Sequence, residues 1–175
     1  MAFVTLRDRL GTLPQQGRVE WIGVRPAHRV PVEAVEQVEA RVGAGLLGDR
    51  YRGSGRRQVT LIQAEHLEVL GSLLGEPVAA AVDSARLRRN FVVRGINLLA
   101  LRQARFRIGA ALFEGTGSCD PCSRMEEELG PGGFNAMRGH GGITARVLEA
   151  GIIARGDVVR LEPATPAPEI QGELL

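Results

Sequence analysis

The sequence predicts a mainly β, barrel-like domain with a few short peripheral helices. Short alternating or β-branched segments recur along the chain, and Gly or polar turns separate them, which is typical of a sheet that curls on itself. The chain has 175 residues, including 23 Gly, and 44% of its residues are hydrophobic. This length suffices for one domain with a core. We expect that domain at 17–162, between an N-terminal extension at 1–16 and a Pro-rich C-terminal tail at 163–175.

The first half of the chain mixes strand and helix signals. Residues 17–24 alternate enough to predict a strand, and residues 58–62 predict a second, shorter one. Residues 63–75 place three Leu on one face at helical spacing, so we expect a helix there. Residues 30–42 leave two alternatives open, because their Val spacing favours a helix whereas Pro31 and the β-branched residues favour extended chain.

From residue 91 onward the pattern is rich in strands. Short apolar segments are bounded by Gly or polar turns, and each is long enough for a strand. The expected strands are 91–93, 97–101, 105–108, 111–114, 145–149 and 157–162. A further short segment, IIA, lies between the last two of these strands.

Charge and composition exclude several function classes. All 22 basic residues are Arg, so a Schiff base between a lysine and pyridoxal phosphate is excluded. Basic pairs are scattered among carboxylates rather than gathered in a stripe, so we expect no nucleic-acid partner. No run of 18 apolar residues and no export signal is visible, so we expect no membrane partner and a cytoplasmic protein.

The most informative segment contains both cysteines, Cys119 and Cys122. Ser123 followed by Glu126 resembles a capping box, which predicts a short helix from Ser123 to Gly130 with Cys122 just before its N-cap. Backbone N–H groups and the helix dipole there favour a thiolate. Four alternatives stay open: a soft metal ligand, a disulfide-exchanging pair, half of a zinc site completed by histidines, or two structural cysteines.

A glycine-rich segment, 130–142, follows directly. Such glycine density allows backbone N–H groups to form an anion-binding nest, to which Arg138 and His140 add hydrogen bonds or positive charge. The alternative is an irregular turn-rich connection. A second turn contains Asp49 and Arg50, for which a surface ion pair and a binding role are equally open.

Several of these segments together resemble the MOSC domain, the C-terminal domain of molybdenum-cofactor sulfurases, which also has stand-alone bacterial relatives. The resemblance covers about residues 17–162, and its motifs stand in the family's order. They are Gly45–Tyr51, Arg88–Val93, Cys119–Glu126, Gly139–Gly142, and the closing Gly151 and Gly156-Asp157. The resemblance implies a MOSC-type β-barrel-like fold with a few peripheral helices.

The resemblance also implies a cofactor, the molybdenum cofactor, which is a pterin dithiolene that bears a phosphate. The family's cysteine, which ligates molybdenum or carries sulfur, maps to Cys122, so this residue is the expected catalytic residue and molybdenum ligand. The candidate cofactor-binding residues are Asp49, Arg50, Arg89, Asn90, Ser123, Arg124, Asn135, Arg138, His140 and Gly141. Of these, Arg89 and Asn90 match the family's Arg-x-Asn-like segment.

Two function classes follow from the resemblance. The first is a small molybdoenzyme that reduces N-hydroxylated compounds, and the second is a sulfur-carrier or cofactor-delivery module with a persulfide on Cys122. Pyridoxal phosphate is associated with the family but has no lysine anchor in this chain. The expected partners are a small-molecule substrate and a separate electron-donor or sulfur-donor protein, with a homodimer left open.

Overall fold

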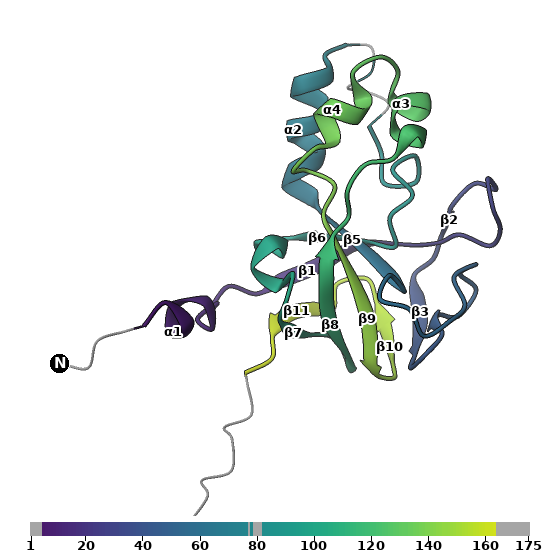
Figure 1. Ribbon diagram of the computed structural model, residues 1–175. Helices are drawn as coiled ribbons and strands as arrows, with labels where there is room; N and C mark the ends of the chain where they lie inside the picture. Colours follow the sequence, from purple (N-terminus) through teal and green to yellow (C-terminus); the bar gives the residue numbers. More distant parts are fainter. Residues whose placement is uncertain (1–4, 77, 79–81, 164–175) are drawn as a thin grey trace, which may run out of the picture.

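Seven strands close into a barrel in the computed structural model, which describes residues 5–76, 78 and 82–163 (Figure 1). Neighbouring strands follow the order β11-β7-β8-β9-β5-β6-β1, and pairing of β1 with β11 completes the ring. The barrel strands are β1 (Gly17–Val24), β5 (Val59–Gln63), β6 (Phe91–Arg94), β7 (Arg105–Ile108), β8 (Ala111–Ser118), β9 (Ile143–Glu149) and β11 (Val158–Leu161). The predicted fold class, mainly β and barrel-like, is confirmed.

Four further strands lie outside the ring of the barrel. β2 (Glu33–Ala34) pairs with the end of β1, while β3 (Gln37–Arg41), β4 (Gly45–Leu46) and β10 (Gly151–Ala154) form a separate three-stranded sheet. Within residues 30–42 the extended alternative is therefore correct. Val38 and Ala40 of β3 are buried on one face of the strand, which is the period of a half-buried strand and not of a helix.

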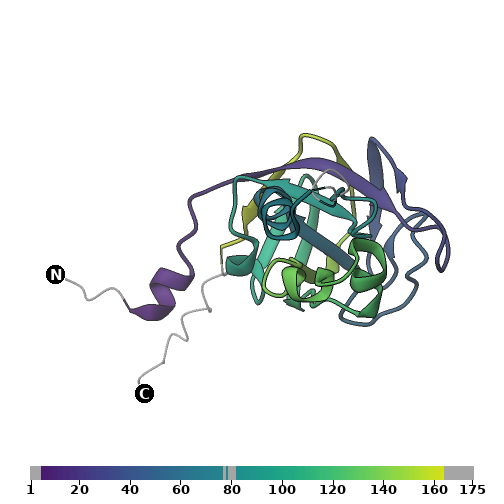
Figure 2. The same cartoon turned by 90° about the horizontal axis from the view of Figure 1, so that it is seen from above.

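Three helices gather over one end of the barrel (Figures 1 and 2). They are α2 (Ala64–Leu74), α3 (Ser123–Leu129) and α4 (Gly133–Met137). The helix α2 connects β5 to β6, which are parallel neighbours, so the connection needs a crossover of this length. A fourth helix, α1 (Leu6–Leu10), lies in the N-terminal extension, away from the other three (Figure 1).

The apolar interior has two parts. One cluster fills the barrel, and within it the rings of Phe106 and Phe113 stack with centroids 5.7 Å apart. A second cluster lies between the barrel and the helices, where Met125 and Leu129 of α3 and Met137 of α4 pack with Leu70 of α2. Burial of these side chains fixes the three helices on the barrel end.

Two sequence predictions about local structure are wrong. The predicted strand 97–101 is a 3₁₀ helix, η2 (Leu98–Leu101), because the Asn97 side chain accepts a hydrogen bond from the Leu99 N–H at 3.1 Å and so caps a turn. The IIA segment, for which no strand was predicted, is strand β10, which pairs with β3. An apolar pattern of only four or five residues does not distinguish a strand from a short helix or a turn.

The predicted capping box is also wrong, although helix α3 begins at Ser123 and ends before Gly130 as expected. The N-cap is Cys122, and its side chain makes no cap hydrogen bond. The Glu126 carboxylate instead accepts from the N–H groups of Gly132 and Phe134, at 2.8 and 2.7 Å. Five residues of the glycine-rich segment, Gly133–Met137, form helix α4, so this segment is not a loop throughout.

Domain boundaries fall close to the ends of the barrel. β1 begins at Gly17 and β11 ends at Leu161, while most of the predicted Pro-rich tail, residues 164–175, lies outside the described residues. Among the described residues, no helix is both long and apolar enough to span a membrane.

Candidate functional site

The two cysteines occupy different environments at the start of α3. Cys122 is exposed, whereas Cys119 is buried at 1% exposure, and both are free thiols. As the N-cap of α3, Cys122 lies where free N–H groups and the helix dipole favour negative charge. Exposure therefore selects Cys122 as the thiol that can reach a ligand.

Cys119 is held by its surroundings. Its backbone N–H donates to the Gly142 carbonyl at 2.9 Å, and the Arg57 guanidinium donates to its Sγ at 3.2 Å. A Cβ at Gly141 would lie 2.1 Å from the Cys119 carbonyl oxygen, so only Gly fits against this backbone. Gly141, a predicted cofactor contact, thus has a packing role beside the cysteine segment.

Arg89 is the central charge of the site. It is 5% exposed, and it donates to the carbonyls of Gly141 at 2.9 Å and Leu87 at 2.7 Å. Its Nη2 is buried without a hydrogen-bond partner among the described residues. Burial lowers the pKa of Arg89, the nearby charges of Arg57 and Arg25 lower it further, and the electrostatic influence of Cys119 and Cys122 opposes that shift. A buried guanidinium nitrogen without a partner is a ready site for an anion.

Asn90 and Asp49 form a buried network instead of an open site. The Asn90 amide nitrogen donates to Asp49 at 2.8 Å and to the Gly23 carbonyl at 3.0 Å. Its amide oxygen accepts from the Thr60 N–H and hydroxyl, each at 3.0 Å, and from Arg25 at 2.9 Å. Both donor hydrogens are therefore taken up within the protein, which makes Asn90 a positioning residue next to Arg89.

Arg25 pairs with Asp49 through one edge of its guanidinium group, where Nε and Nη2 donate to the two carboxylate oxygens at 2.9 and 3.0 Å. Burial would raise the pKa of Asp49, but the hydrogen bonds and charge of Arg25, with the N–H groups of Tyr51 and Arg25, lower it. Arg25 and Arg57 are the residues that sequence reasoning did not find. Each is one of many scattered arginines in the chain, so only the tertiary contacts distinguish them.

The remaining candidates are spread over the helical end. Arg124 is half-buried and pairs with Glu128 at 2.8 Å. His140 lies against His66 of α2, with ring centroids 5.0 Å apart. Four of the candidates are exposed, and among the described residues no side-chain hydrogen bond or ion pair links them to either cysteine: Arg50, Ser123, Asn135 and Arg138. The structure therefore brings Arg89, Gly141 and both cysteines together, with Asn90 and Asp49 behind them.

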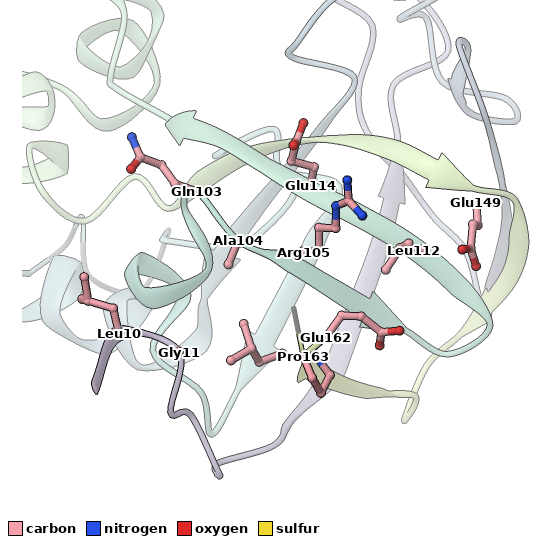
Figure 3. A pocket seen from close by; sticks show the side chains of 11 residues that line it. Leu10, Gly11, Gln103, Ala104, Arg105, Leu112, Glu114, Glu149, Glu162 and Pro163 are labelled. Carbon is pink, nitrogen blue, oxygen red and sulfur yellow. The ribbon is translucent and has the colours of Figure 1, made fainter. Parts of the chain in front are cut away.

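A cavity elsewhere in the molecule contains none of these residues. It measures about 540 Å³ and lies against strands β7, β8 and β11, with Leu10 of α1 at its edge (Figure 3). Its charged lining consists of Arg105 and three carboxylates, Glu114, Glu149 and Glu162. Among the described residues, no group of three or more His, Cys, Asp or Glu side chains is placed to hold a metal, so the zinc alternative has no ligand set there.

Comparisons with known proteins agree with this architecture. The YuaD protein from Bacillus subtilis has a TM-score of 0.73 and 18% identity, over 88% of this chain and all (100%) of that one. YiiM from Escherichia coli has a TM-score of 0.67 and 17% identity, over 85% of this chain and 71% of that one. YiiM from Geobacillus stearothermophilus has a TM-score of 0.66 and 19% identity, over 83% of this chain and 75% of that one.

At these identities the three structures show a shared fold. No curated protein matches the chain in a sequence comparison. The model of the MOSC domain matches residues 48–160, a range that begins at the turn before Asp49 and contains Arg89, Asn90 and both cysteines. Because this match spans more than half of the chain and the barrel resembles those of the solved structures, the chain belongs to the MOSC domain family.

Proposed function

We propose that this MOSC protein binds the molybdenum cofactor, with Cys122 as the protein ligand to molybdenum, and reduces N-hydroxylated compounds. The family is associated with molybdenum-cofactor binding, and this association supports the choice of cofactor. The observation that carries the proposal is an exposed thiol at a helix N-cap beside a buried arginine whose Nη2 has no partner among the described residues.

The residues present fit such a group. A cysteine sulfur is a soft ligand suited to molybdenum, and Cys122 is exposed at the start of α3, where it can reach a metal. The cofactor carries negative charge on its dithiolene and phosphate, which Arg89 neutralises through its free nitrogen. The network of Asn90, Asp49 and Arg25 fixes the backbone next to Arg89 and so fixes the direction of the guanidinium.

When bound, the cofactor supplies two-electron redox chemistry. Reduction of an N-hydroxyl group to the amine consumes two electrons and two protons and releases one water molecule. A separate electron-donor protein is the proposed source of the electrons, and solvent is the proposed source of the protons. The free thiols of both cysteines suit a reducing compartment, so the proposal places the protein in the cytoplasm.

A sulfur carrier is the second candidate, since the exposed thiol of Cys122 also suits a persulfide. Metal analysis separates the two. Protein purified from a molybdenum-replete host is expected to contain molybdenum near one atom per chain, and Cys122→Ser to lose nearly all of it, because a hydroxyl is a harder and far less acidic ligand.

The matched control is Cys119→Ser, which is expected to retain most of the molybdenum because Cys119 is buried. Mass spectrometry of the same samples detects a persulfide by its added sulfur. A persulfide on Cys122 without bound metal would support the sulfur carrier and contradict the molybdoenzyme. Loss of metal in Cys119→Ser with retention in Cys122→Ser would overturn the assignment of the ligand.

A further inference from the structure

Four arginines from three segments line a second cavity next to the site. It measures about 230 Å³, and its charged lining consists of Arg29, Arg86, Arg88, Arg124 and Glu128. We call this cavity the arginine pocket. Arg29 comes from the turn after β1, Arg86 and Arg88 from the segment before β6, and Arg124 from α3. The segments are distant in sequence, so the fold itself assembles this concentration of positive charge.

The pocket carries more positive than negative charge. Glu128 pairs with Arg124 at 2.8 Å and with Arg86 at 3.9 Å, and the Arg86 guanidinium also donates to the Glu128 carbonyl. Arg88 donates to the Val30 carbonyl at 2.7 Å. Among the described residues, neither Arg88 nor Arg29 forms an ion pair with a carboxylate. Within the described part of the chain, the lining of the pocket therefore contains four guanidinium groups and the carboxylate of Glu128.

The electrostatic potential around Arg88 is also positive. Burial lowers the pKa of Arg88, and the positive charges of Arg124, Arg25 and Arg50 lower it further, against a smaller opposing effect of Glu128. Such a crowd of like charges is unfavourable in the free protein. Binding of an anion relieves the repulsion, and planar guanidinium groups match the oxygens of phosphate in pairs.

The backbone at two of these arginines is unusual. Arg29 and Arg88 have φ angles of 61° and 55°, and they are the non-glycine residues with positive φ in the described part of the chain. Side chains that are neither Gly, Asn nor Asp rarely adopt this conformation, and such residues cluster at ligand sites. Both line the arginine pocket, which is an observation independent of the charge count.

We propose that the arginine pocket binds the phosphate group of a small-molecule ligand. Its volume lies below the roughly 300–1,000 Å³ of sites that enclose a whole drug-sized ligand, so it suits a phosphate or diphosphate group. Arg124 is two residues from Cys122, and Arg88 is adjacent to Arg89. The phosphate can therefore belong to the pterin cofactor or to a separate phosphorylated metabolite.

The direct test uses full-length protein free of molybdenum and titrates inorganic pyrophosphate by calorimetry. We expect saturable binding that weakens as the salt concentration rises, because exposed charges are screened. Arg88→Asn and Arg29→Asn are the informative variants, since Asn tolerates positive φ and keeps the backbone while the charge is lost. Each is expected to lower the affinity at least tenfold, and Arg160→Asn, an exposed position on β11, to leave it unchanged.

Circular dichroism confirms that each variant is folded, and Arg124→Gln provides a further variant with an ordinary backbone. Wild-type protein without saturable binding, or arginine-pocket variants that bind as tightly as wild type, would overturn the proposal. Titration of cofactor-loaded protein distinguishes the sources: blocked binding indicates the cofactor's own phosphate, and retained binding a separate metabolite. Absence of molybdenum in wild-type protein would refute the proposed function while leaving pyrophosphate binding intact.

Discussion

At the scale of single residues, adjacent side chains have different tasks. Arg88 lines the arginine pocket, Arg89 points to the cysteine segment, and Asn90 bonds across the barrel end to Asp49. Arg88 has a φ of 55°, which turns it away from the strand direction, and the side chains of Arg89 and Asn90 alternate in direction where the chain enters β6, so three consecutive polar residues have three different surroundings. Asn90 has no exposed surface, and five hydrogen-bond partners depend on it, so its contribution to stability is expected to be large.

We predict that Asn90→Ala lowers the free energy of unfolding by about 3 kcal/mol, because it leaves several buried partners without hydrogen bonds. Urea denaturation at neutral pH measures this difference. The matched control is Asn135→Ala, at an exposed position, which is expected to change the free energy by less than about 0.5 kcal/mol. Equal effects of the two substitutions would contradict the network.

At the scale of elements, the segment between α4 and β9 is attached to α2 through a histidine pair. The rings of His66 and His140 meet edge to face, and the Nδ1 atom of each is buried without a hydrogen-bond partner among the described residues. Burial lowers the pKa of His66, and electrostatic repulsion from His140 lowers it further. A hydrogen bond with the His140 backbone and the charge of Glu65 oppose this lowering. His66 is therefore held best in its neutral state.

This arrangement predicts a pH dependence of stability. The folded-state pKa of His66 lies below its ordinary value of about 6.5, so the unfolded chain binds the proton first as the pH falls. Stability is thus fully present above about pH 6.5 and decreases below it, until the pH reaches the folded-state pKa. We expect urea denaturation between about pH 7.5 and pH 5.5 to show this loss in wild-type protein and a shallower loss in His66→Gln.

The matched control for the pH dependence is His28→Gln, because His28 is exposed in the turn after β1. Its slope of stability against pH is expected to equal that of the wild type. An unchanged slope in His66→Gln would show that the contact between α2 and the segment before β9 is insensitive to the charge of this ring.

At the scale of the whole molecule, a closed barrel supports the site from below. The helices α2, α3 and α4 stand over one end of the barrel (Figure 1). The candidate site residues come from α3 and α4 and from segments that adjoin the barrel strands, so strand positions determine site geometry. Closure by β1 and β11 also removes free sheet edges from the ring. The packing inside the barrel should therefore control the stability of the entire domain.

We predict that Phe113→Ala lowers the free energy of unfolding by about 4 kcal/mol, since it removes a fully buried ring stacked on Phe106. Thermal and urea unfolding followed by circular dichroism measure the loss. Phe134→Ala is the matched control: that ring is 40% exposed on α4, so a change below about 1 kcal/mol is expected. A similar loss in both variants would mean that the barrel interior does not dominate stability.

Much of the scaffold could be predicted from the sequence, because local pattern and local structure agree there. Strand β1 has the predicted bounds, Gly17–Val24, and β7 has the predicted bounds, Arg105–Ile108. The short helix after Cys122 and the crossover helix α2 were also predicted. These elements have either clear alternation, clear helical spacing or a terminal glycine, which act over a few residues.

The candidate site was predictable only in part. Cys122 and Arg89 are recognisable by motif, but burial of Arg89, exposure of Cys122 and the contact of Arg57 with Cys119 depend on segments far apart in the chain. The role of Glu126 was misassigned for a more local reason. In a capping box, the Glu126 carboxylate would accept from the N-cap backbone. It accepts instead from the N–H groups of Gly132 and Phe134 in the following turn, because that turn presents two donors to one carboxylate.

The sequence by itself determined the barrel class and the family, since each rests on residue types and their spacing along the chain, and it predicts Cys122 as the reactive thiol. Only the tertiary structure decided which of 22 arginines carry unbalanced charge. Pairing with carboxylates depends on distance in space: Arg25 is neutralised by Asp49, whereas Arg89 keeps an unpartnered nitrogen among the described residues and Arg88 lies among other arginines. Burial then strengthens the field of the unbalanced charges, because the protein interior screens them less than water does.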